Sequence, residues 1–181
     1  NSQNLNLGDI QNVDTLKLNI SGSVTQSEGA EVIVDNLELS LGGSDKITLT
    51  NDGNQIQNIS GGVGAGHIST NGPLSIGNLI VNGNDDFAIS AVGENANVSQ
   101  ASGSILQILS NAAISASEVT LSETIHISNG ASLEFNDVKH FVLSATLQGD
   151  AGAGEETLTV NGSGEDDLFE VLTSANWDEL V

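Results

Sequence analysis

Short runs of alternating apolar and polar residues recur along almost the whole chain. The clearest lie at residues 15–20, 32–41 and 46–50, where Val, Ile or Leu occupy roughly every second position. Successive side chains of a β-strand point to opposite faces, so each run predicts a strand with one buried face. Helical spacing is almost absent. The chain is therefore predicted to be all-β.

The same pattern continues to the C-terminal part of the chain. It predicts further strands at 74–76, 79–81, 88–90, 105–109, 119–121, 125–127, 133–135, 141–143 and 157–160. Glycine occurs 21 times and proline once, and Asn and Ser are frequent, so turns separate the strands throughout. Short, evenly spaced strands are compatible with a sandwich, a barrel or a solenoid.

Internal repetition favours the solenoid. Residues 23–29 are echoed by residues 97–103, which places Gln26 and Gln100 74 positions apart. With coils of roughly 20 residues, this repeat spans three or four coils, and the chain holds eight or nine. The predicted fold is a parallel β-helix with Asn- and Gly-rich turns, in which Asn side chains of adjacent coils stack and bond the rungs above and below.

Composition limits both the core and the partners. Only four Phe and one Trp accompany Val, Ile, Leu and Ala, which predicts a thin core of small side chains in layers, and the absence of cysteine excludes disulfides and thiolate metal sites. A net charge of −21, from 24 acidic and three basic residues, repels phosphate backbones and anionic lipids. No apolar run approaches the ~18 residues of a membrane span. Nucleic-acid binding and membrane insertion are not expected.

One ordered set of motifs resembles a known family. Residues 22–26 (GSVTQ), 34–39 (VDNLEL) and 46–56 (KITLTNDGNQI) are similar to the repeat of filamentous haemagglutinin-like, two-partner-secretion exoproteins, and the similarity covers about residues 21–121. This resemblance implies a right-handed parallel β-helix, export to the bacterial cell surface or matrix, and a role in adhesion, biofilm or filament building. The secretion domain of the family is not seen, so a stalk segment or a small relative is expected.

The C-terminal part differs from the repeat region. Residues 1–148 are predicted to form the β-helix repeat, and residues 149–181 to form acidic C-terminal coils or a subunit junction, either separate from or continuous with the helix. Residues 149–158 look like a degenerate calcium-binding Gly-Asp repeat. The candidate calcium ligands are Asp150, Glu155, Glu156, Glu165, Asp166 and Asp167.

Both ends of a β-helix leave unpaired backbone groups that require a cover. The N-terminal segment, residues 1–8, is short and polar, and the sequence ends on apolar residues. The ends are therefore expected to be covered by a longer chain or by the next subunit, with Trp177, Leu180 and Val181 at the interface.

The sequence contains few groups of residues that could support catalysis. The chain contains no arginine, which argues against a lyase of the β-helix type. A glycosidase could use Asp85 with Asp86, or Glu165 to Asp167, but few aromatic platforms are present. His67, His126 and His140 show no metal-ligand spacing. The glycines at 61–66 predict a flexible loop. No enzyme activity, catalytic residue or organic cofactor is predicted.

These observations predict an extracellular bacterial structural or adhesive scaffold that assembles through open β-helix ends, with cell-surface glycans as candidate partners. Two alternatives stay open: a calcium-binding module of a large secreted adhesin, and a β-helix polysaccharide-degrading enzyme.

Overall fold

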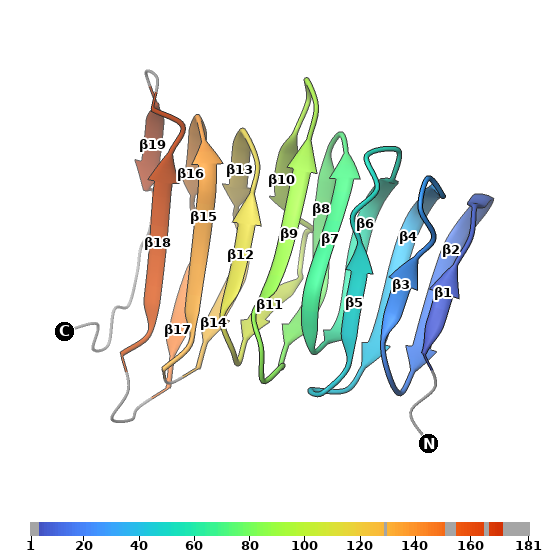
Figure 1. Cartoon of the computed structure of the whole chain (residues 1–181). Helices are drawn as coiled ribbons and strands as arrows, with labels where there is room; N and C mark the ends of the chain where they lie inside the picture. Colours follow the sequence, from blue (N-terminus) through green and yellow to red (C-terminus); the bar gives the residue numbers. More distant parts are fainter. Residues whose placement is uncertain (1–3, 129, 151–154, 165–166, 172–181) are drawn as a thin grey trace.

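The chain forms a parallel β-solenoid of about seven turns. The computed structural model describes residues 4–128, 130–150, 155–164 and 167–171, and in this part every regular element is a strand. Figure 1 shows the coils side by side from β1 to β19. The all-β parallel solenoid predicted from the sequence is confirmed. Within the same residues there is no helix long and apolar enough to cross a membrane.

Two parallel sheets form the walls of the solenoid. The first has the order β1-β3-β5-β7-β9-β12-β15-β18. Its strands are β1 (Leu5–Leu7), β3 (Val24–Gln26), β5 (Lys46–Leu49), β7 (Ala65–Asn71), β9 (Phe87–Val92), β12 (Ala112–Ser115), β15 (Ser132–Val138) and β18 (Thr157–Gly162).

The second sheet has eleven strands and begins with four long ones. These are β2 (Ile10–Ile20), β4 (Val32–Leu41), β6 (Gln55–Val63) and β8 (Leu74–Val81). Shorter strands follow: β10 (Asn97–Gln100), β11 (Ile105–Ile108), β13 (Glu118–Leu121), β14 (Thr124–Ile127), β16 (His140–Leu143), β17 (Thr146–Gly149) and β19 (Leu168–Val171). The predicted boundary at 148/149 falls inside β17, and β18 and β19 continue both sheets beyond it.

The predicted number of eight or nine coils is too high. Paired residues in adjacent coils are separated by 19 positions for Leu5 and Val24, but by 25 positions for Phe87 and Ala112. Most coils are therefore longer than the assumed 20 residues, because their turns vary in length while the strand register is kept.

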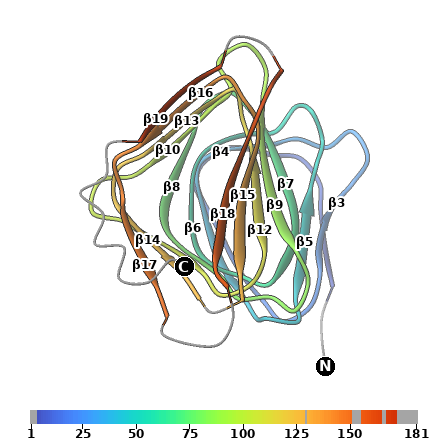
Figure 2. The same ribbon diagram turned by 90° about the vertical axis from the view of Figure 1, so that its left-hand side faces the viewer.

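The solenoid changes its cross-section at β8. One edge of this strand pairs with β6, whereas the opposite edge pairs with β10 near Leu74 and with β11 near Leu79. The side chain of Asn78 accepts a hydrogen bond from the Ile105 amide at 2.9 Å, which supports the branch. Seen along the axis, β10, β13, β16 and β19 lie outside the line of β4 and β6 (Figure 2).

The interior is a single apolar core filled by stacked side chains of both sheets. One column runs through Ile47, Gly66, Phe87 and Ala112. The small residues on either side of Phe87 leave room for its ring, so large and small side chains alternate to keep the core tightly packed. Phe87 itself is buried.

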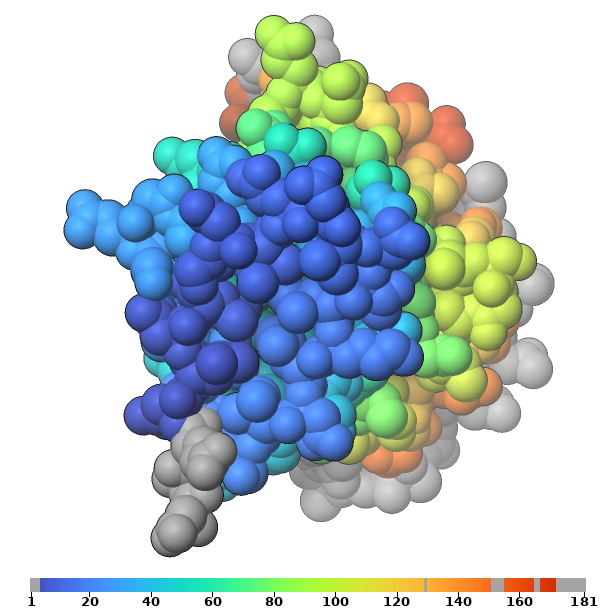
Figure 3. Space-filling model, turned by 90° about the vertical axis from the view of Figure 1, so that its right-hand side faces the viewer, coloured from blue at the N-terminus to red at the C-terminus, as the bar shows by residue number. Residues whose placement is uncertain are grey.

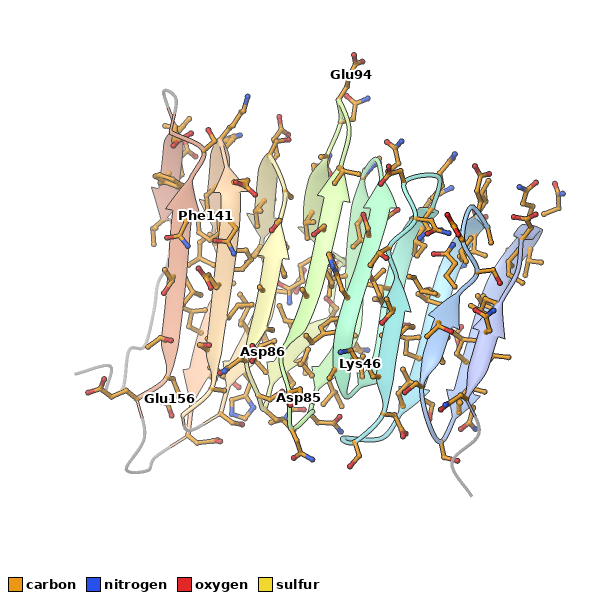
Figure 4. The ribbon with its side chains drawn as sticks, in the orientation of Figure 1. Lys46, Asp85, Asp86, Glu94, Phe141 and Glu156 are labelled. Carbon is orange, nitrogen blue, oxygen red and sulfur yellow. The ribbon has the colours of Figure 1, made fainter. Side chains whose placement is uncertain are left out.

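The expectation of a core without large side chains is wrong for the C-terminal half. Phe87, Phe135 and Phe141 are the largest fully buried side chains, and the rings of Phe135 and Phe141 are 5.1 Å apart. Charged residues such as Asp85 and Glu94 are exposed at the corners, while Phe141 belongs to the interior (Figure 4). Aromatic rings thus fill the core of the coils that follow the branch.

The glycine cluster at 61–66 is not a flexible loop as predicted. Gly61 lies near the end of β6, and Gly66 lies in β7. Gly61 has a φ of +102°, and a Cβ at this position would lie 1.9 Å from the carbonyl oxygen of Leu39. The glycines are required because the backbones of adjacent coils approach closely at this corner. These glycines therefore allow the close approach of adjacent coils.

The echo of Gln26 in Gln100 reflects a shared turn rather than a repeat of whole coils. Gln26 ends β3 in the first sheet, and Gln100 ends β10 in the second. Each is followed by a tight turn with a left-handed glycine, Gly29 or Gly103. The Gln100 side chain donates to the Thr124 carbonyl of the next coil at 2.8 Å.

A buried amide closes the corner between β3 and β4. Asn54 is 0% exposed, and its Oδ1 accepts hydrogen bonds from the Val32 amide at 2.9 Å and from the Gln26 side chain. Its Nδ2 donates to Gln26 Oε1 at 3.0 Å. Two stacked asparagines elsewhere, Asn36 and Asn58, donate instead to backbone carbonyls of the preceding coil.

Candidate functional site

The predicted calcium ligands are not assembled into a site within the described residues. Asp150 Oδ1 lies 2.9 Å from His126 Nε2, and Asp167 accepts a hydrogen bond from Ser163 at 2.8 Å. Glu155 is exposed. The described residues include no group of three or more His, Asp or Glu side chains that could hold a metal ion.

The remaining predicted calcium ligands are Glu156, Glu165 and Asp166. Glu156 lies beside Gly149, and its buried Oε1 has no hydrogen-bond partner in the part of the chain that the structure describes (Figure 4). Glu165 and Asp166 lie outside the described residues. The calcium site therefore stays a prediction.

The histidines bond to neighbouring coils. His67 Nε2 lies 2.9 Å from Ser90 Oγ, and His126 Nδ1 lies 3.4 Å from Gln107 Nε2. His67 belongs to β7 and not to the predicted loop, and His140 begins β16. All three histidines lie on strands of the two sheets, which agrees with the predicted surface or rung positions.

The N-terminal end of the solenoid is an uncovered rung. β2 pairs with β4 on one edge, and no described strand lies on its other edge. Leu5, Ile10, Leu16 and Ile20 of this first coil are only partly buried. Figure 3 looks onto this end, with the first coil facing the reader. The predicted interface residues at the other end, Trp177, Leu180 and Val181, lie outside the described residues.

An open groove of about 750 Å³ runs across five rungs of the second sheet. It extends from β2 over β4 and β6 to the starts of β8 and β10. Adjacent rungs are about 4.8 Å apart, so four steps give a length of about 19 Å along the axis. The lining residues are 12–14, 33–35, 55–58, 71, 73–75, 97 and 99.

The surface of the groove is about half polar and half apolar, and the described residues that line it include no basic side chain. Its lining contains six Asn or Gln amides, two carboxylates and two Ser hydroxyls. Gln57 Nε2 donates to Asp35 Oδ1 at 2.9 Å, and Asn58 donates to the Asp35 carbonyl at 2.9 Å. These bonds fix the centre of the floor. Val13, Ile33 and Pro73 supply the apolar part of the surface.

Two carboxylates are stacked in this groove. Val13 pairs with Val34 and Thr15 with Asn36, so the register sets the backbone of Asp14 beside that of Asp35 on the adjacent rung. Like charges in directly opposite positions are destabilising. Three positions further on, the same two strands place Lys17 beside Glu38, with 2.7 Å between Nζ and Oε2. Strands β2 and β4 thus pair opposite charges outside the groove, at Lys17 and Glu38, but not inside it.

Sequence reasoning missed the groove, although it identified the strands that form most of its floor. Comparisons with protein-family models, with curated proteins and with solved structures gave no match. The groove is an elongated surface, without a basic side chain among its described lining residues, and it is rich in groups that both donate and accept hydrogen bonds.

Proposed function

We propose that this chain is a rigid, non-enzymatic segment of an extracellular bacterial scaffold with structural and adhesive roles, such as a surface fibre, a filament or a biofilm matrix. The observation that carries the proposal is the 11-residue edge of β2, which pairs with no strand among the described residues, on a solenoid of continuous parallel ladders. A long unpaired strand edge is a template for a further strand. A further coil, from a longer chain or from a second copy, completes this end.

The branch at β8 provides an internal precedent for such a junction. One edge of this long strand holds two shorter parallel strands, β10 and β11. The edge of β2 is long as well, whereas the coils after the branch present short strands. A head-to-tail stack would bring the long edge of one copy onto the short strands of the next; at β8 a long strand holds two short strands on its other edge, the one that faces the later coils.

One carboxylate pair offered for glycoside hydrolysis takes part in contacts between coils. Asp85 and Asp86 lie side by side in sequence in an exposed corner before β9 (Figure 4). Asp86 Oδ1 accepts a hydrogen bond from Asn111 at 3.2 Å, and the Asn111 side chain accepts one from Ser132 at 3.0 Å. These bonds link successive coils, so Asp86 contributes to the stack.

Association of the full chain tests the proposal. We expect analytical ultracentrifugation and electron microscopy to show elongated particles that lengthen with protein concentration. Val13→Lys places a charge on the open rung and should prevent this lengthening, because edge lysines oppose strand addition. Val92→Lys is the matched control, since Val13 is 41% exposed and Val92 39% exposed.

Compact particles that never associate would contradict self-assembly through this edge. An equal effect of both lysine substitutions would show that charge alone, and not the β2 edge, controls association.

A further inference from the structure

We propose that the groove across β2, β4, β6, β8 and β10 binds a neutral, polyhydroxylated chain, that is, a linear segment of an uncharged glycan. The inference rests on the adhesive half of the proposed function and names the ligand class of its binding surface.

The shape of the groove favours a linear ligand. It crosses five consecutive rungs, so its length follows the solenoid axis and not a single turn. A single sugar or a small cofactor would leave most of the lining residues without contact. An extended polymer that lies along the axis contacts each rung in turn.

The polar groups favour hydroxyl ligands. Amides outnumber carboxylates by six to two in the lining. An amide both donates and accepts hydrogen bonds, as a sugar hydroxyl does, whereas a surface for a cationic peptide would consist chiefly of acceptors. The described residues that line the groove include two carboxylates and no Lys, Arg or His, so an anionic glycan would be repelled.

The lining also has side chains available for a ligand. Within the described part of the chain, the side chains of Asp14, Gln55 and Asn97 make no hydrogen bond or ion pair that would have to be broken. Asp14 and Gln55 are exposed, and Asn97 is half-buried. Ligand hydroxyls can donate to the stacked carboxylates of Asp14 and Asp35, which offsets the cost of placing the two charges on adjacent rungs.

Isothermal titration of the full chain tests this inference. The probes are maltohexaose, cellohexaose, chitohexaose and mannohexaose as neutral chains, a heparin hexasaccharide as an anion and hexalysine as a cation. We expect at least one neutral chain to bind and the heparin fragment not to bind. Asp14→Ala combined with Gln55→Ala should weaken the binding about tenfold, as expected for two lost hydrogen bonds.

The control removes one carboxylate and one uncharged polar side chain from the same sheet outside the groove. Glu118→Ala combined with Thr120→Ala, both exposed on β13, should leave the affinity unchanged. Binding of hexalysine alone, of heparin alone or of no probe would overturn the inference, as would equal losses in the two double variants. Sugar cleavage during the titration would overturn the non-enzymatic scaffold instead.

The two proposals fail in different measurements. Loss of glycan binding with concentration-dependent rods intact removes only the ligand assignment. Glycan binding by a chain that never forms rods removes only the assembly through β2.

Discussion

Replacing Asn54 with alanine tests whether one buried amide holds the corner between the two sheets. The side chain is fully buried and bonds both the Val32 backbone and the Gln26 side chain. Alanine removes all of these bonds and introduces no new group. Val32 is itself 0% exposed, so its N–H group cannot find water without opening the coil.

The expected loss follows from which groups stay unpaired. A buried polar group without a partner costs about 1–3 kcal/mol. This applies in full to the Val32 amide, but only in part to Gln26, because that side chain is half-buried and also donates to the Ala30 carbonyl at 2.8 Å. We therefore expect Asn54→Ala to lower the free energy of unfolding by about 2–3 kcal/mol, a large share of the 5–15 kcal/mol typical of a domain.

Urea unfolding followed by far-UV circular dichroism measures this loss. The control is Asn95→Ala, an exposed position in a turn, which should change stability by less than about 0.5 kcal/mol. Amide exchange at Val32 gives the local readout and should become faster only in the Asn54 variant. A loss below about 1 kcal/mol with unchanged exchange at Val32 would refute the reasoning.

Three further substitutions test other features of the stack by the same urea assay. Gly61→Ala should cost at least about 3 kcal/mol, since its Cβ would overlap the preceding coil and its φ is positive, whereas Gly8→Ala, in open space, should be neutral. Phe141→Ala should cost about 3–5 kcal/mol, and Phe169→Ala clearly less because that ring is 45% exposed. Lys17→Ala should cost at most about 0.5 kcal/mol, because its ion pair is exposed.

Alternation located several strands, including β4, whose inward positions change phase between Val34 and Leu37. The prediction at 32–41 matches β4 in both bounds, and those at 119–121 and 125–127 differ from β13 and β14 by one residue. In these strands every inward position is a large aliphatic residue, so the pattern is visible without knowledge of the coil.

β6 was missed because it combines a change of phase with glycines. β6 buries Ile56, Ile59 and Val63, which are three and four positions apart. The strand bends at a corner of the coil, and its side chains change phase there. The last part of the strand contains glycines because the backbone of the adjacent coil lies close to it. A glycine-rich sequence by itself predicts a loop, so this strand was not recognised. Local pattern could not show this, because the cause lies in the adjacent coil.

The groove could not be predicted, because it depends on register between distant residues. Its lining reaches from Asn12 to Ser99, and each residue alone is typical of a polar strand or turn.

Only the register places Asp14 beside Asp35, on the same strands that set Lys17 against Glu38. A stack selected for stability alone has no reason to hold two like charges on adjacent rungs, and such local conflicts are expected where a surface serves a ligand. The unbalanced pair at the β2 end of an amide-rich groove is therefore the strongest physical reason to look for binding on this flank and not only at the ends of the solenoid.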